Sequence, residues 1–124
     1  MTGVQTCALP IFLKLELTNH VFLPGSVPEA HQYLKTFDLF VLPSVKEGLP
    51  YAMLKAQVAQ IPIVATKVGA NAEILASEQL VKPADPELLA QKIKKALKSG
   101  PQIISVNIPP WEKFLQETIK LYLN

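Results

Sequence analysis

Short, mainly apolar segments alternate along the chain with longer segments whose apolar residues recur every three or four positions. Segments of the first kind predict strands, and segments of the second kind predict helices. The expected strands are residues 21–23, 38–42, 62–66 and 79–82. The expected helices are residues 26–37, 50–60, 86–99 and 111–123, with a short helix through Ile74 and Leu75. Strands that alternate with helices of this length indicate an α/β fold with a parallel sheet.

One helix carries clear signals at both of its ends. Asp85 is expected to be the N-cap of the helix over 86–99, with Pro86 at its first position. Gly100 and Pro101 follow the last apolar residues, and this pair stops a helix.

The composition is that of a small domain that packs a core. Hydrophobic residues make up 49% of the chain and charged residues only 18%. The net charge of +2 is too small to indicate a nucleic-acid partner. All 12 basic residues are lysines, so any arginine clamp for a phosphate must lie outside this chain. No apolar run approaches membrane-spanning length, and a soluble cytoplasmic protein is the expectation.

The first eleven residues, MTGVQTCALPI, resemble a translated sequencing-library adapter rather than protein sequence. A signal peptide is the poorer explanation, because no basic residue precedes the apolar stretch and Pro10 interrupts it. We therefore expect residues 1–11 to be a non-native, adapter-derived segment and the natural sequence to start near Phe12, in mid-gene. The only cysteine, Cys7, lies in this segment, so the rest of the chain has no disulfide and no cysteine-based metal site.

The most informative segment is 43–50, PSVKEGLP, which lies between an expected strand and an expected helix. Ligands of open α/β sheets bind beyond the carboxyl ends of the strands. The N-terminus of a helix there offers free N–H groups and the positive end of its dipole. An anion can bind those N–H groups while Glu47 accepts hydrogen bonds from a polyol.

Five segments in order carry a resemblance to a known family. They are VFLPG at 21–25, DLFVLPS at 38–44, EGLP at 47–50, IPIVATKVGA at 61–70 and AEI at 72–74. From His20 to about Leu97 the chain resembles the C-terminal half of the nucleotide-sugar-binding domain of a family 4 glycosyltransferase. Such enzymes are retaining and of the GT-B type, with two Rossmann-like domains that face a cleft.

The resemblance implies a partial Rossmann-like three-layer α/β/α domain, with a mainly parallel sheet that lacks its first strands. Residues 12–108 would form part of the C-terminal donor-binding domain, and residues 109–124 would form its closing helix. In the strand order 3-2-1-4-5-6, two missing strands would separate the segments at 21–23 and 38–42. The isolated chain is therefore expected to be marginally stable and prone to aggregate.

The same resemblance assigns roles to the loop after residues 38–42. Glu47 would be the catalytic acid that contacts hydroxyls of the donor sugar. Gly48 and Leu49 would give backbone N–H groups to the sugar or diphosphate, and the helix starting at Pro50 would stabilise the leaving diphosphate. No metal and no other cofactor are required in such enzymes.

Three further residues are candidates for donor binding. Ser44 could bond a phosphate, although a serine at a strand end is commonly a turn-former. Gly69 would allow a sharp loop beside the nucleotide, although glycine marks turns in most proteins. Lys55 stands where the family has a second glutamate that accepts hydrogen bonds from the ribose, and lysine can only donate. Lys55 either faces a wet cleft or extends into solvent.

The implied function is sugar transfer, of the hexosyltransferase type, from a nucleotide-diphosphate sugar to a glycan, lipid or small-molecule acceptor. The chain alone is expected to be inactive, because the acceptor domain and the diphosphate clamp precede it in such enzymes. The alternatives are a non-catalytic or decayed α/β module and a nucleotide-sugar epimerase of the same fold. Peripheral membrane contact of the full enzyme is a further expectation, although lysines such as those at 92–98 more commonly form a solvated helix face.

Overall fold

The computed structural model describes residues 9–100, which divide into two compact units, one ending at Ala30 and the other beginning at His31. In the first unit, helix α1 (Leu9–Lys14) is followed by turns and by an irregular segment. The prediction of a strand at 21–23 is wrong for this structure. A strand needs a partner that completes its hydrogen bonds, and the described residues pair no strand with this segment.

The second unit contains a parallel sheet of three strands, β1 (Phe40–Leu42), β2 (Ile63–Thr66) and β3 (Leu80–Val81), in the order β1-β2-β3. Val41 lies opposite Val64, and Thr66 lies opposite Val81. Three of the expected strands are therefore confirmed, together with their parallel arrangement.

Helical segments precede, connect and follow the strands, and most of them begin and end near the expected positions. They are the 3-10 helix η1 (Ala30–Thr36), α2 (Tyr51–Val58), α3 (Asn71–Ile74), the 3-10 helix η2 (Ser77–Gln79) and α4 (Pro86–Ser99). The helix expected at 26–37 is shorter and of the 3-10 type, because Pro28 and the left-handed backbone of Glu29 (φ 51°) precede it. The closing helix expected at 109–124 lies outside the described residues.

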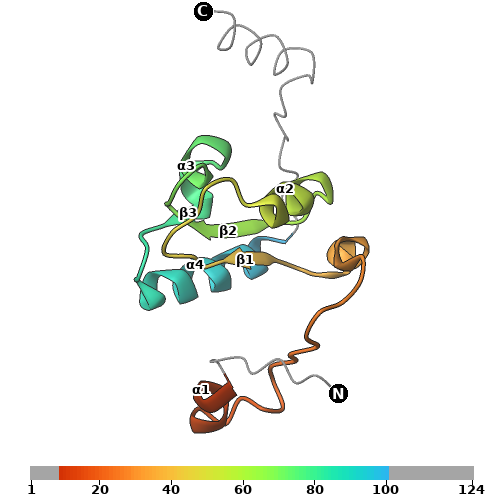
Figure 1. Ribbon diagram of the computed structural model, residues 1–124. Helices are drawn as coiled ribbons and strands as arrows, with labels where there is room; N and C mark the ends of the chain where they lie inside the picture. Colours follow the sequence, from red (N-terminus) through yellow and green to blue (C-terminus); the bar gives the residue numbers. More distant parts are fainter. Residues whose placement is uncertain (1–8, 101–124) are drawn as a thin grey trace, which may run out of the picture. The chain divides into compact units, whose positions relative to one another are not determined.

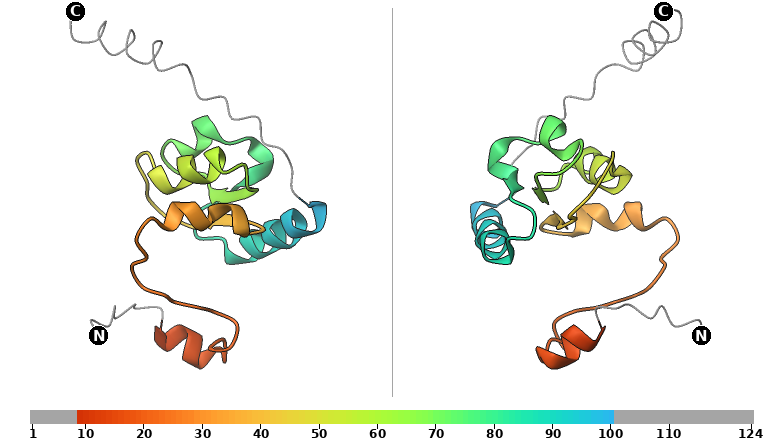
Figure 2. Two further views of the ribbon diagram at one scale, coloured as in Figure 1. Left: turned by 90° about the vertical axis from the view of Figure 1, so that its right-hand side faces the viewer. Right: turned by 60° about the vertical axis from the view of Figure 1, so that its left-hand side comes forward.

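The helices cover both faces of the sheet and complete three layers. Helices α2 and α3 lie on one face, and α4 lies on the other (Figures 1 and 2). All four residues of the central strand β2 are buried, whereas the three residues of β1 are only partly buried. The main core is formed by Met53, Ala56, Ile61, Ile63, Ala65 and Leu75. The expected partial Rossmann-like α/β/α domain is confirmed, and it brings the carboxyl ends of β1 and β2 to the same edge.

The cap of α4 gives a prediction for stability. The Asp85 carboxylate accepts a hydrogen bond from the Leu88 N–H at 2.9 Å, and Pro86 occupies the first position, as expected. Asp85→Ala should lower the free energy of unfolding by about 1 kcal/mol, because it leaves an N–H group of the first turn without its partner. Urea unfolding of the full-length protein would measure this loss. Asp85→Asn keeps an acceptor oxygen and should stay close to the wild type; an equal loss in both variants would contradict the role of the cap.

Candidate functional site

Two loops meet beyond the carboxyl ends of β1 and β2. The first, residues 43–50, joins β1 to α2, and the second, residues 67–70, joins β2 to α3. The N–H group of Ala70 donates a hydrogen bond to the carbonyl oxygen of Gly48 at 3.0 Å. Parallel strands end side by side, so residues more than 20 positions apart in the chain become neighbours here.

Gly69 allows the two loops to approach each other this closely. Its φ is +48°, a region that side chains disfavour. A Cβ atom at this position would lie 2.1 Å from the carbonyl oxygen of Glu47 and 2.8 Å from that of Gly48. Both obstacles are backbone atoms, so no side-chain rotation can relieve the overlap. Gly69 is thus required by contact with the first loop, a more specific reason than the sharp turn expected from the sequence.

Within the first loop, Ser44 holds the carboxylate of Glu47. The Ser44 hydroxyl donates to Glu47 Oε1 at 2.6 Å, and both side chains are partly buried. Ser44 uses its only proton in this bond, so it can serve a phosphate only if it releases Glu47. The second carboxylate oxygen, Oε2, is not engaged by Ser44.

Helix α2 begins beside this carboxylate. Pro50 is buried and is the N-cap residue of α2. The helix therefore begins at Tyr51, one residue later than expected. Proline offers no capping side chain, and none caps this end of α2 in the described part of the chain. Gly48 and Leu49 just before it are exposed. The loop therefore presents a carboxylate next to a helix N-terminus that favours anions.

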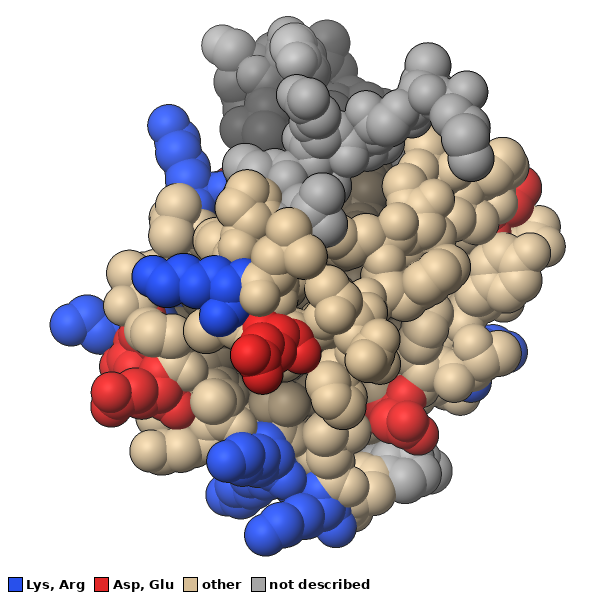
Figure 3. All heavy atoms as spheres, turned by 90° about the horizontal axis from the view of Figure 1, so that it is seen from below, with Lys and Arg blue, Asp and Glu red and all other residues tan. Residues whose placement is uncertain are grey.

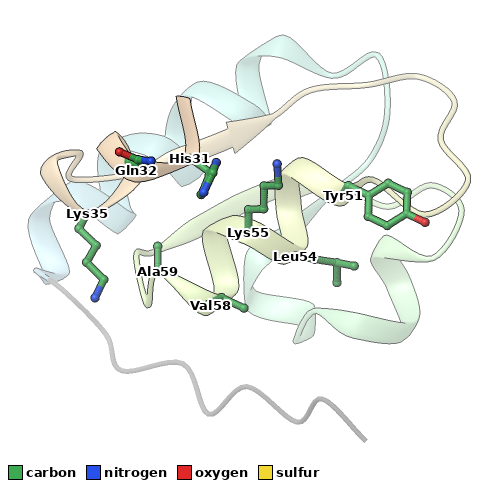
Figure 4. Close-up of a pocket in the computed structure, with 8 residues that line it drawn as sticks. All are labelled: His31, Gln32, Lys35, Tyr51, Leu54, Lys55, Val58 and Ala59. Carbon is green, nitrogen blue, oxygen red and sulfur yellow. The ribbon is translucent and has the colours of Figure 1, made fainter. Parts of the chain in front are cut away.

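Lys55 lies farther along α2 and lines a groove between α2 and η1. The groove has a volume of about 390 Å³, and its lining residues are His31, Gln32, Lys35, Tyr51, Leu54, Lys55, Val58 and Ala59. Figure 4 shows the Lys55 side chain extending from α2 on the side where His31 lies, whereas the Tyr51 ring points away from the other labelled residues. The side chain of Lys55 is exposed, and the groove has no acidic residue among the described residues that line it.

The structure brings together Ser44, Glu47, Gly48 and Gly69, and it places Lys55 in the groove. Sequence reasoning missed Thr66 and Asn71, which are buried directly behind the first loop. Thr66 ends a buried strand, and a polar residue at the carboxyl end of a parallel strand was an available signal.

Among residues 9–100, no three His, Cys, Asp or Glu side chains gather into a set that could hold a metal ion. None of the helices in this part of the chain combines the length and apolarity needed to cross a bilayer. One of the lysines of α4, Lys92, donates a hydrogen bond to the carbonyl oxygen of Glu78 at 2.8 Å. On the face that Figure 3 displays, acidic side chains lie among the lysines.

Comparisons with known proteins agree on one family. The family model described as "Glycosyl transferases group 1" matches residues 5–99. The "Putative teichuronic acid biosynthesis glycosyltransferase TuaC" of Bacillus subtilis (strain 168) is 36% identical over 90 residues, which are 69% of this chain and 23% of TuaC. The "Putative glycosyltransferase EpsF" of the same organism is 29% identical over 108 residues, 83% of this chain and 26% of EpsF.

A third relative has a more specific name. The "UDP-Gal:alpha-D-GlcNAc-diphosphoundecaprenol alpha-1,3-galactosyltransferase" of Escherichia coli is 35% identical over 57 residues, 46% of this chain and 15% of that enzyme. The chain thus spans about a quarter or less of the length of these curated relatives.

Proposed function

The chain belongs to the group 1 glycosyl transferases, and on that premise we propose that it is part of the donor-binding domain of a retaining, family 4 enzyme of the GT-B type. The full-length protein would bind a nucleotide-diphosphate sugar and transfer the sugar to an acceptor. The chain alone would lack the acceptor domain and the basic clamp for the diphosphate, and it would not catalyse transfer.

One observation carries this proposal: the Glu47 carboxylate is held by Ser44 at the start of α2, where the two loops meet. A carboxylate accepts hydrogen bonds from sugar hydroxyls, and a helix N-terminus stabilises phosphate. A sugar diphosphate carries both of these groups next to each other. The arrangement therefore suits the part of the donor where the glycosidic bond breaks.

In the proposed reaction, Glu47 Oε2 accepts a hydrogen bond from a hydroxyl of the donor sugar and thereby orients the ring. The N–H groups of Gly48 and Leu49 donate to the sugar or the diphosphate. As the bond to the diphosphate breaks, negative charge grows on the leaving oxygen. The dipole of α2 and the amides that precede it stabilise this charge electrostatically.

The names of the relatives favour an acceptor of the cell surface. One name refers to teichuronic acid biosynthesis and another to a diphosphoundecaprenol-linked sugar. We propose an acceptor of this class, a growing glycan or a lipid-linked sugar. The lysine-bearing helix α4 would face the headgroups if such an acceptor lies in a membrane.

The groove between η1 and α2 is the proposed place of the nucleoside, because it lies along the same helix as the diphosphate. Lys55 in this groove is the feature that favours the second candidate function, a decayed module. It cannot accept hydrogen bonds from the two ribose hydroxyls, as the family's glutamate does.

Donor binding by the full-length protein tests the proposal, with Lys55→Glu as the informative variant. We expect uridine diphosphate to bind the wild type measurably by calorimetry. Lys55→Glu should tighten this binding about tenfold, because a carboxylate can accept from the ribose hydroxyls. The affinity for the dideoxy analogue, which lacks the 2′ and 3′ hydroxyls, should not increase in Lys55→Glu.

Lys35→Glu is the matched control, because it makes the same charge change on the other side of the groove. It should not tighten binding of uridine diphosphate. If no uridine or guanosine diphosphate sugar binds either the wild type or Lys55→Glu, the transferase proposal fails and the decayed module is favoured. If Lys55→Glu increases the affinity for the dideoxy analogue as much as that for uridine diphosphate, residue 55 does not bind the ribose hydroxyls.

A further inference from the structure

We propose that Thr66 and Asn71 are positioning residues for Glu47, although neither touches the space in front of its carboxylate. The inference rests on the proposed function, since it assigns these two residues to the site where Glu47 acts. Thr66 is 3% exposed and Asn71 is 0% exposed. Both lie behind the loop at 43–50, at the end of the central strand and the start of α3.

A continuous chain of hydrogen bonds runs from Asn71 to Glu47. The Asn71 amide Nδ2 donates to the carbonyl oxygen of Thr66 at 2.9 Å. The Thr66 hydroxyl in turn contacts two acceptors, the carbonyl oxygen of Ser44 and that of Leu42, the latter at 3.3 Å. The Ser44 hydroxyl then donates to Glu47 Oε1 at 2.6 Å.

Thr66 fixes the backbone from which the Ser44 side chain extends. The single proton of its hydroxyl lies between the carbonyl groups of Leu42, the last residue of β1, and Ser44 in the loop. The Ser44 carbonyl lies beyond the strand ladder, which ends at Leu42, so the Thr66 hydroxyl gives it a hydrogen bond that the ladder does not supply. The direction of the Ser44 hydroxyl, and with it the position of Oε1, therefore depends on Thr66.

Asn71 places a polar amide in a fully buried position. Its Nδ2 bond defines the orientation of the amide, since the reversed amide would set its oxygen against the Thr66 carbonyl. In this orientation Oδ1 is buried and has no hydrogen-bond partner among the described residues. A buried acceptor without a partner is unfavourable. The amide is therefore not explained by packing, whereas its bond to Thr66 gives it a role in the chain that leads to Glu47.

The experiment combines hydrogen exchange and kinetics in the full-length protein. Thr66→Val keeps the shape of the side chain and removes the hydroxyl, and Thr66→Ser keeps the hydroxyl. We expect the backbone amides of residues 44–49 to exchange about tenfold faster in Thr66→Val and in Asn71→Leu. We expect kcat/KM for UDP-galactose, or for whichever UDP-sugar the wild type uses, to fall about tenfold through kcat. Thr66→Ser should keep both the amide exchange rates of the loop and kcat/KM close to those of the wild type.

Ile61→Ala is the control for a general loss of stability, because Ile61 is buried in the same core but precedes β2 at its amino end. Ile61→Ala should not selectively speed amide exchange at residues 44–49. The proposal is overturned if Thr66→Val leaves amide exchange at residues 44–49 unchanged, if faster exchange there leaves kcat unchanged, or if Ile61→Ala has the same effects. If the wild type transfers no sugar, the proposed function fails, while the exchange result still decides whether these residues order the loop.

Discussion

Glu47→Gln is expected to lower kcat/KM of the full-length protein for its nucleotide sugar about 10²-fold, which corresponds to about 2.7 kcal/mol of lost transition-state stabilisation. The substitution keeps the size of the side chain but replaces one acceptor oxygen by a donor. Because Ser44 donates to Oε1, the amide oxygen would remain with Ser44, and the NH₂ group would face the sugar in place of Oε2. Initial rates with a radiolabelled donor sugar would measure the loss.

Two further measurements make this result specific. Affinity for uridine diphosphate, which lacks the sugar, should change less than about twofold in Glu47→Gln, because Glu47 acts on the sugar. Glu73→Gln removes an exposed carboxylate from α3 and should leave the rate near that of the wild type. A rate for Glu47→Gln within threefold of the wild type would remove Glu47 from the reaction.

Gly69→Ala should have the largest effect on stability, a loss of about 3 kcal/mol in the free energy of unfolding. The new Cβ would meet backbone atoms of Glu47 and Gly48 at 2.1 and 2.8 Å, and the residue would keep an unfavourable φ of +48°. The two loops would have to separate, and the hydrogen bond from Ala70 to Gly48 would be lost. Thermal or urea unfolding of the full-length protein would measure the loss.

Substitutions at two other glycines distinguish the cost of the positive φ from the cost of the contact between the loops. Gly100 also has a positive φ, +69°, but no atom of residues 9–100 lies within 4 Å of its Cβ position, so Gly100→Ala should show the backbone cost alone, about 1 kcal/mol. Gly48 has no positive φ, and the described part of the chain places no atom within 4 Å of its Cβ position, so Gly48→Ala should be close to neutral for stability. Equal losses at positions 69 and 100 would show that contact between the loops contributes nothing.

The sequence predicted most of the second unit because its signals are local. The unbroken apolar character of residues 62–66 predicted a strand covered on both faces, and all four residues of β2 are buried. Asp85 and Pro86 predicted the start of α4, since an N-cap requires only neighbours in the sequence. The strand expected at 21–23 was wrong because an apolar run does not specify a partner.

The sequence predicted individual residues of the candidate site but not the hydrogen bonds that join them. The strand-loop-helix pattern pointed to Glu47 and Gly48, and the structure adds that Ser44 bonds Glu47. The contacts of Thr66 with Ser44 and Leu42 span 22 and 24 positions along the chain, and no spacing rule reveals such pairs. The same holds for Gly69, whose neighbours lie in the preceding loop.

The close approach of Gly69 to the loop at 43–50 also bears on how this site can change during evolution. Two segments in backbone contact do not accept substitutions independently, and effects of changes at contacting residues are commonly non-additive. A new side chain in either loop has to be matched by a change in the other. Epistasis should therefore be concentrated between residues 44–49 and 67–71, and donor preference should shift through paired substitutions across the two loops rather than through single ones.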